Sequence, residues 1–158
     1  MSDKHTLSCL VENHFGVLAR VAGLISARGF NIDSLTVSTT EDPTVSRMTI
    51  VVDADAAKLE QVKAQLNRLI DVIGVLEYKE GAYINRELLL ARVTVGAKGL
   101  HELDAIAKKY GAKVADSTDH AAIVEATGDT KTLDKLVEDL KPHQITQLVR
   151  TGRVALEK

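Results

Sequence analysis

Tryptophan is absent from this 158-residue sequence, and cysteine, proline and the aromatic residues are scarce. Aromatic side chains make up only 3% of the chain, which argues against a surface that stacks nucleic-acid bases. The single cysteine, Cys9, excludes an internal disulfide and a zinc site built from several thiolates. Because Cys9 lies in an alternating apolar pattern, we interpret it as a small buried core residue rather than as a reactive thiol.

A strong charge of either sign is also missing, because the formal net charge is only -2. A balanced charge gives no general attraction to nucleic acid or to an anionic membrane. No apolar run approaches the roughly 18 residues that a membrane span needs. The first residues, MSDKHT, lack the apolar core of a signal peptide. We therefore expect a protein of the cytoplasm, or of an equivalent reducing compartment, that binds neither nucleic acid nor membrane.

Sequence signatures of common catalytic sites are absent as well. The chain contains no G-x-S-x-G, no G-x-x-x-x-G-K-[ST], no H-E-x-x-H and no G-x-G-x-x-G. Asp116, Asp119 and His120 could cluster around a metal, but they fall in an expected turn, where a solvated polar surface is the favoured interpretation. We expect no catalytic residue, metal or cofactor on this chain.

Hydrophobic periodicity in the first half predicts the order β-α-β-β-α-β. Alternating apolar residues predict strands over 6–11, 31–40, 47–53 and 72–78. Apolar stripes at helical spacing begin at Val17 and Ala56, and the second stripe runs to Ile70. Gly29 ends the first helix, and the acidic and proline residues of 41–44 predict a turn that makes a hairpin.

The second half repeats this order, with strands expected at 88–95, 112–116, 121–127 and 145–150 and helices within 100–110 and 133–140. The boundary is expected near Gly81. The sequence therefore predicts an α+β protein of two ferredoxin-like βαββαβ domains, at 1–80 and 81–158, each with both helices on one face of an antiparallel sheet. Because roughly 75 residues make a small core, we expect each half to need a partner surface.

The turn between the first strand and the first helix, residues 13–18, is the candidate binding site. The first N–H groups of a helix lack internal partners and, with the helix dipole, can bind a carboxylate. Gly16 would allow a ligand to approach the backbone closely or would take a positive φ. Asn13 can cap the helix or offer its amide, although both residues could merely form the turn. Asn31 opens the second strand, and neighbouring strand ends could place Asn13 and Asn31 around one small ligand.

Residues 13–35 resemble the ACT domain of acetolactate synthase (acetohydroxyacid synthase) small subunits. The family pattern is N-x-x-G-x-L-x-R-V-x-G-L-F-x-x-R-G-[YF]-N-I-x-S-L, from which only Ile25 departs. Residues 41–50 match the second family signature, while 86–90 and 150–152 resemble parts of the family's C-terminal domain. The resemblance covers nearly the whole chain and is looser over about 96–140, and the sequence stops short of an Arg-Gly that often follows.

The resemblance implies a non-catalytic regulatory subunit in branched-chain amino acid biosynthesis. Such a subunit binds the catalytic large subunit, activates it and confers feedback inhibition by valine, or by leucine or isoleucine. The effector lies between two paired ACT domains, which implies a homodimer. Thiamine diphosphate, Mg²⁺ and FAD belong to the large subunit. The positions that match the family's effector site are Asn13, Gly16, Val17, Asn31 and Ile32, with His14, Phe15 and Leu18 as neighbours.

Two other functions compete with this one. The first is an ACT-type amino-acid-sensing module of another regulator, such as a transcriptional regulator, but no helix-turn-helix or basic face accompanies it. The second is a small ferredoxin-like enzyme that works alone, for which no convergent catalytic set is present. An assay of acetolactate production by an added large subunit distinguishes all three.

Overall fold

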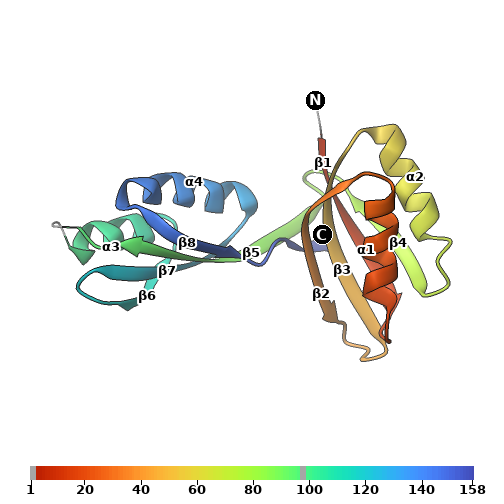
Figure 1. Ribbon diagram of the computed structural model, residues 1–158, viewed down its shortest axis with the longest axis horizontal. Coiled ribbons are helices and arrows are strands. Elements are labelled where there is room, and N and C mark those ends of the chain that lie inside the picture. Colours follow the sequence, from red (N-terminus) through yellow and green to blue (C-terminus); the bar gives the residue numbers. More distant parts are fainter. Residues whose placement is uncertain (1–2, 97–98) are drawn as a thin grey trace. The chain divides into compact units, whose positions relative to one another are not determined.

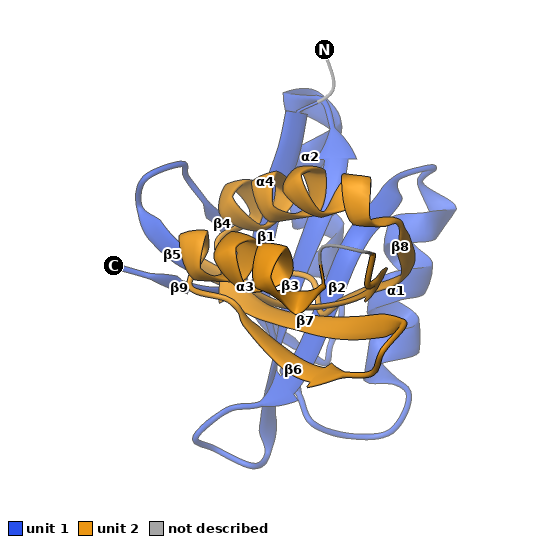
Figure 2. Ribbon diagram, turned by 90° about the vertical axis from the view of Figure 1, so that its left-hand side faces the viewer, with its two compact units in different colours: residues 1–84, 153–158 blue, residues 85–152 orange. Residues whose placement is uncertain are grey.

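A computed structural model describes residues 3–96 and 99–158, and the chain divides into two compact units (Figure 2). The first unit comprises the described residues up to Ile84 together with Arg153–Lys158, and the second comprises Asn85–Gly152. The expected division at 80/81 assigned the C-terminal residues to the second half. They return to the first unit instead, because a final strand pairs with the start of the strand that leaves it.

The first unit has the predicted β-α-β-β-α-β order, with both helices on one face of an antiparallel sheet (Figure 1). The strands lie in the order β2-β3-β1-β4, so β2 is an edge strand. The elements are β1 (Asp3–Glu12), α1 (Val17–Ala27), β2 (Asn31–Thr39), β3 (Val45–Ala54), α2 (Ala56–Leu66) and β4 (Val72–Tyr78).

The second unit repeats the order around a sheet arranged β6-β7-β5-β8, which confirms the predicted α+β class with two ferredoxin-like halves. A short 3-10 helix, Lys141–His143, follows its last α-helix. The elements are β5 (Tyr83–Thr94), α3 (Leu100–Lys109), β6 (Lys113–Ser117), β7 (Ala121–Gly128), α4 (Thr130–Leu140) and β8 (Ile145–Arg150), followed by β9 (Val154–Glu157).

The structure differs from the predicted elements at the end of α2 and at the C-terminus, and β5 begins at Tyr83, five residues before the expected strand. Helix α2 ends at Leu66, whereas its apolar stripe predicted a helix up to Ile70. Leu69 packs against the core from the turn after the helix, so it imitates helical spacing, while Ile70 is 94% exposed. Strand β9 was not predicted, because four residues give too short a pattern to read.

The core of the first unit lies between the sheet and its two helices. Alternate residues of β1 point into it, and Val17, Val21 and Ile25 of α1 meet them from the helical side. Cys9 is fully buried there, and burial raises the pKa of its thiol to about 11, which confirms the structural interpretation of this residue.

Among the described residues, no helix has the length and apolar character required to cross a bilayer.

Strand β9 is attached to the first unit by side-chain contacts as well as by its pairing with β5. The hydroxyl of Tyr78 donates to the carbonyl of Ala155 at 3.2 Å, in a buried position. Nη1 of Arg153 donates to Oγ1 of Thr6 at 2.9 Å. The ring of Tyr78 also stacks on Tyr83, with centroids 5.0 Å apart. The C-terminal residues are therefore part of the first unit's structure.

Candidate functional site

Helix α1 begins at a glycine and has no side-chain cap. Gly16 occupies the N-cap position with φ 84°, a left-handed conformation that favours glycine. In contrast, Asp55 caps α2 by accepting from the N–H of Lys58, and Asp129 caps α4 by accepting from Thr132. The first turn of α1 therefore keeps its N–H groups available for another acceptor.

Asn13 is held in place by the turn between β2 and β3. Its backbone N–H donates to the carbonyl of Thr44 at 2.7 Å, and its side-chain Nδ2 donates to the carbonyl of Pro43 at 2.9 Å. Because a carbonyl can only accept, the amide nitrogen must face Pro43, which leaves Oδ1 of Asn13 as an acceptor. Asn13 and His14 line an open hollow of about 380 Å³ beside this turn.

The other predicted residues of this turn differ in exposure. Phe15 is 98% exposed and Leu18 is 46% exposed, so both side chains face away from the core. Val17 is only 2% exposed, because its side chain packs inside the first unit. Val17 can therefore contribute its backbone N–H to a ligand at the helix start, but its side chain already has a structural role.

Asn31 and Ile32 do not lie beside Asn13 in the same chain. Glu12, the residue before Asn13, pairs with Val45 at one end of β3, whereas Asn31 pairs with Asp53 at the other end. Eight residues of strand separate these ends, which is about 26 Å. The expectation that one chain gathers Asn13 and Asn31 around a small ligand is therefore wrong. The cause is that β3 lies between β1 and β2 and is antiparallel to both.

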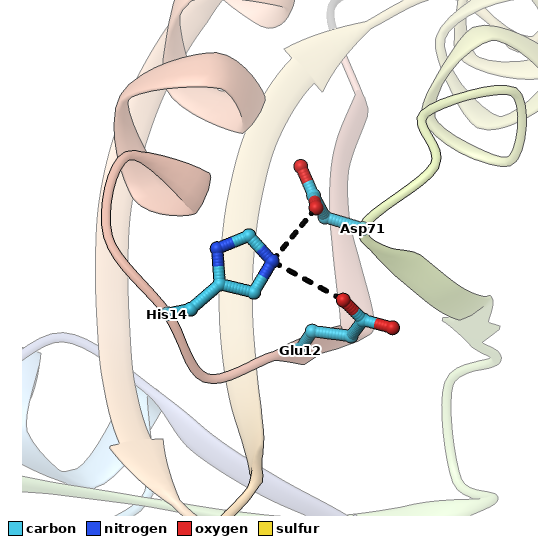
Figure 3. A group of neighbouring side chains, drawn as sticks. All are labelled: Glu12, His14 and Asp71. Carbon is cyan, nitrogen blue, oxygen red and sulfur yellow. Dashed lines mark hydrogen bonds and ion pairs between the residues drawn. The ribbon is translucent and has the colours of Figure 1, made fainter.

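His14 connects the turn to the loop before β4 (Figure 3). Its Nε2 lies 2.8 Å from Oδ1 of Asp71 and 3.1 Å from Oε2 of Glu12, and its Nδ1 lies 3.3 Å from the carbonyl of Phe15. All three partners are acceptors, so the protonated imidazole, with two N–H donors, satisfies them best. The Phe15 carbonyl, followed by Glu12 and Asp71, raises the pKa of His14 above its ordinary value.

Arg20 and Asp71 are two residues of this region that sequence reasoning missed. Nε of Arg20 donates to Oδ2 of Asp71 at 2.8 Å, and the side chain of Asp71 is only 8% exposed. Two signals could have indicated Arg20: it follows Gly16 by one helical turn, and it matches the arginine of the family pattern. No local pattern could have indicated Asp71, because it lies 51 residues further along the chain.

Glu12, His14 and Asp71 also form the one group within residues 3–96 and 99–158 whose ligand atoms lie close enough to hold a metal ion. Arg20 already pairs with Oδ2 of Asp71, and a cation would have to replace the proton of His14 Nε2 that faces Oδ1 of Asp71 and Oε2 of Glu12. The contacts therefore favour an ion-pair cluster. Asp116, Asp119 and His120 do not form such a group among these residues, and all three are exposed.

The chain matches two protein families, one in each half. Residues 7–74 match the family described as an AHAS small subunit-like ACT domain, and residues 86–158 match the family described as the small subunit of acetolactate synthase. The first unit is therefore an ACT domain, and the chain is a two-domain member of the ACT class. The second match extends this assignment to the rest of the chain.

Whole-chain relatives carry the same description. The acetolactate synthase small subunits of Mycobacterium leprae and Mycolicibacterium smegmatis are 45% and 42% identical, covering 98% of this chain and 91% of each relative. The crystal structure of the acetolactate synthase small subunit from Thermotoga maritima is similar with a TM-score of 0.89 and 32% identity, covering 99% of this chain and 98% of that one. The chain belongs to the family of acetolactate synthase small subunits.

Proposed function

We propose that this chain is the regulatory subunit of an acetolactate synthase and has no catalytic site or cofactor of its own. It binds the catalytic large subunit, raises its activity and makes it sensitive to feedback inhibition by valine or a related branched-chain amino acid. Family membership along the whole chain supports the partner. Thiamine diphosphate, Mg²⁺ and FAD would belong to that partner.

The observation that carries the effector site is the uncapped start of α1 behind Gly16. An α-amino acid has a carboxylate, which suits these N–H groups and the positive end of the helix dipole. Its ammonium group suits an acceptor such as Oδ1 of Asn13, which the contact with Pro43 leaves open. One turn of chain thus offers complementary groups for both charges of the ligand.

The strand order supports a site that two copies share. Strand β2 is an edge strand, with backbone groups open to pairing on one side. If two copies pair antiparallel through β2 about a two-fold axis, Asn31 of one copy comes to the end of the sheet at which Asn13 of the other lies. This arrangement joins the two halves of the predicted site, which a single chain separates.

The expected affinity suits a sensor. Burial of a valine side chain contributes about 1.5–3 kcal/mol, and each charge-assisted hydrogen bond contributes about 1.5–3 kcal/mol. Association and ordering costs offset part of this. Micromolar to millimolar binding follows, so the ligand leaves when its concentration falls. Pocket contacts separate ligands that differ by one methylene by only about 1–3 kcal/mol.

The test measures acetolactate formation by the large subunit with and without this chain, each with and without valine. We expect no activity from the chain alone, a higher rate when both are present, and inhibition by valine only in the mixture. Calorimetric titration with L- and D-valine, leucine, isoleucine and alanine then names the effector. An unchanged rate on addition of the chain would refute the regulatory role.

A further inference from the structure

We infer that Arg20 binds the carboxylate of the amino-acid effector and that Asp71 is the residue that positions its guanidinium. The inference rests on the proposed effector site at the start of α1. It adds Arg20, which matches the arginine of the family pattern but was not among the predicted effector residues, and Asp71, which lies outside that pattern. It also explains why the buried Asp71 lies near the start of α1, where its negative charge alone would repel the effector carboxylate.

The side chain of Arg20 lies over the glycine that begins the helix. Side chains on a helix point back toward its N-terminus, so a residue one turn after the N-cap can cover the first turn. Accordingly, a Cβ atom added to Gly16 would lie 3.4 Å from Nη1 of Arg20. A group that approaches the open N–H groups behind Gly16 therefore also approaches the guanidinium.

Asp71 holds one edge of this guanidinium and leaves the other edge open. Its Oδ2 accepts from Nε and contacts Nη2 of Arg20, while its Oδ1 lies 2.8 Å from Nε2 of His14. Nη1 of Arg20 has no hydrogen-bond partner in the part of the chain that the structure describes, and the Arg20 side chain is 49% exposed. A planar guanidinium fixed in this way presents its free edge in one direction.

The charges around the turn fit a zwitterion better than a simple anion. Asp71 is neutralised by Arg20 and His14, both of which it contacts. The free edge of Arg20 and the helix dipole attract the carboxylate, while Glu12 and Oδ1 of Asn13 lie nearby as acceptors for the ammonium group. The carboxylate thus has a side-chain cation in addition to backbone donors.

The experiment compares calorimetric binding of L-valine and L-valinamide, which lacks the carboxylate charge, to the full-length chain alone and with the large subunit added. We expect the wild-type chain to prefer valine, and Arg20→Met to weaken valine binding by about 10- to 100-fold with little change for valinamide. Arg20→Lys should keep part of the preference because it keeps the charge. Lys141→Met, which removes an exposed cation of the second unit, is the control and should change neither affinity.

Asp71→Asn tests the positioning role. It should lower the affinity for valine several-fold and leave valinamide binding nearly unchanged, since Arg20 loses its anchor but not its charge. If Arg20 and Asp71 only brace the fold, both variants lower the thermal unfolding midpoint and keep the wild-type preference for valine, which would overturn the inference alone. If the wild-type chain binds no branched-chain amino acid under either condition, the proposed function and the inference both fail.

Discussion

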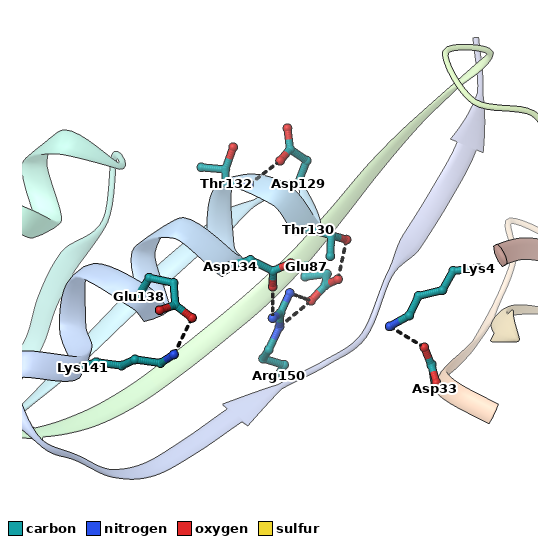
Figure 4. Close-up of polar contacts among 10 residues, drawn as sticks. All are labelled: Lys4, Asp33, Glu87, Asp129, Thr130, Thr132, Asp134, Glu138, Lys141 and Arg150. Carbon is teal, nitrogen blue, oxygen red and sulfur yellow. Dashed lines mark hydrogen bonds and ion pairs between the residues drawn. The ribbon is translucent and has the colours of Figure 1, made fainter. Parts of the chain in front are cut away.

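The carboxylate of Glu87 in β5 and the guanidinium of Arg150 in β8 form an ion pair inside the second unit (Figure 4). Nε of Arg150 donates to Oε2 of Glu87 at 2.8 Å, and the Glu87 side chain is only 5% exposed. Oγ1 of Thr130 donates to Oε1 of Glu87 at 2.7 Å, and Asp134 accepts from Nη1 of Arg150 at 2.6 Å. Every charge in this group therefore has a partner.

Arg150→Met is expected to destabilise the protein by about 3–5 kcal/mol, because it leaves the buried Glu87 carboxylate without its cation. Urea unfolding measures the change. Lys141→Met is the matched control: it removes the pair of Lys141 with Glu138, both side chains being at least 60% exposed, and should cost at most about 1 kcal/mol. Equal effects of the two substitutions would contradict the importance of burial.

Gly16→Asp is expected to abolish inhibition by valine while activation of the large subunit is kept. The new carboxylate would begin at a Cβ atom 3.4 Å from Nη1 of Arg20, where it competes with the effector carboxylate and repels it. We expect no inhibition even at about 10-fold the valine concentration that half-inhibits the wild-type complex, since like charges in contact cost several kcal/mol.

Gly16→Asn is the control for this substitution, because it has nearly the same shape, carries no charge and tolerates a positive φ. It should keep measurable inhibition. Inhibition of Gly16→Asp at wild-type valine concentrations would remove the helix start from the effector site.

Mixed dimers test whether two chains share each site. Asn13→Ala and Asn31→Ala homodimers should each bind valine weakly, because each lacks one side chain at both sites. In a hybrid dimer, one site combines the intact Asn31 of one chain with the intact Asn13 of the other. After subunit exchange at equal amounts, about one quarter of all sites should recover wild-type affinity. If titration of the exchanged mixture shows no sites with wild-type affinity for valine, Asn13 of one chain and Asn31 of the other do not share a site.

The contacts of His14 predict a pH dependence. Because the Phe15 carbonyl, Glu12 and Asp71 raise its pKa in the folded chain, the protonated form stabilises the folded state. This contribution is fully present below the ordinary histidine pKa of about 6.5 and is lost as the pH rises through the raised value. NMR titration should therefore give His14 a pKa above 6.5, and Asp71→Asn should lower it. A His14 pKa at or below the ordinary value in the wild-type chain would contradict the ion-pair cluster.

Tyr78→Phe tests the attachment of the C-terminal strand. The substitution removes only the hydroxyl that donates to the buried carbonyl of Ala155, so that carbonyl loses its side-chain donor. We expect a loss of about 1 kcal/mol in the free energy of unfolding. Tyr110→Phe in the second unit removes a part-buried hydroxyl that donates to Asp139 and serves for comparison. No change for Tyr78→Phe would show that β9 adds little to the first unit.

Local patterns predicted most of the secondary structure correctly. Alternation placed β4 and β8 at their observed bounds, and the helical stripe placed the first residue of α1 at Val17. These predictions succeeded because strand and helix periods are repeated over several turns or pleats. Strand β9 was missed because its pattern is short, and the predicted end of α2 was wrong because the apolar pattern continued into a turn after Leu66.

The sequence by itself determined the two βαββαβ halves, the glycine at the start of α1 and the resemblance that led to the family. Only the tertiary structure decided that Asn13 and Asn31 lie at opposite ends of β3 and that Asp71 meets Arg20 and His14. The physical reason is the range of each signal. Periodicity records which face of an element is buried, whereas strand order and contacts across 51 residues depend on how distant segments pack.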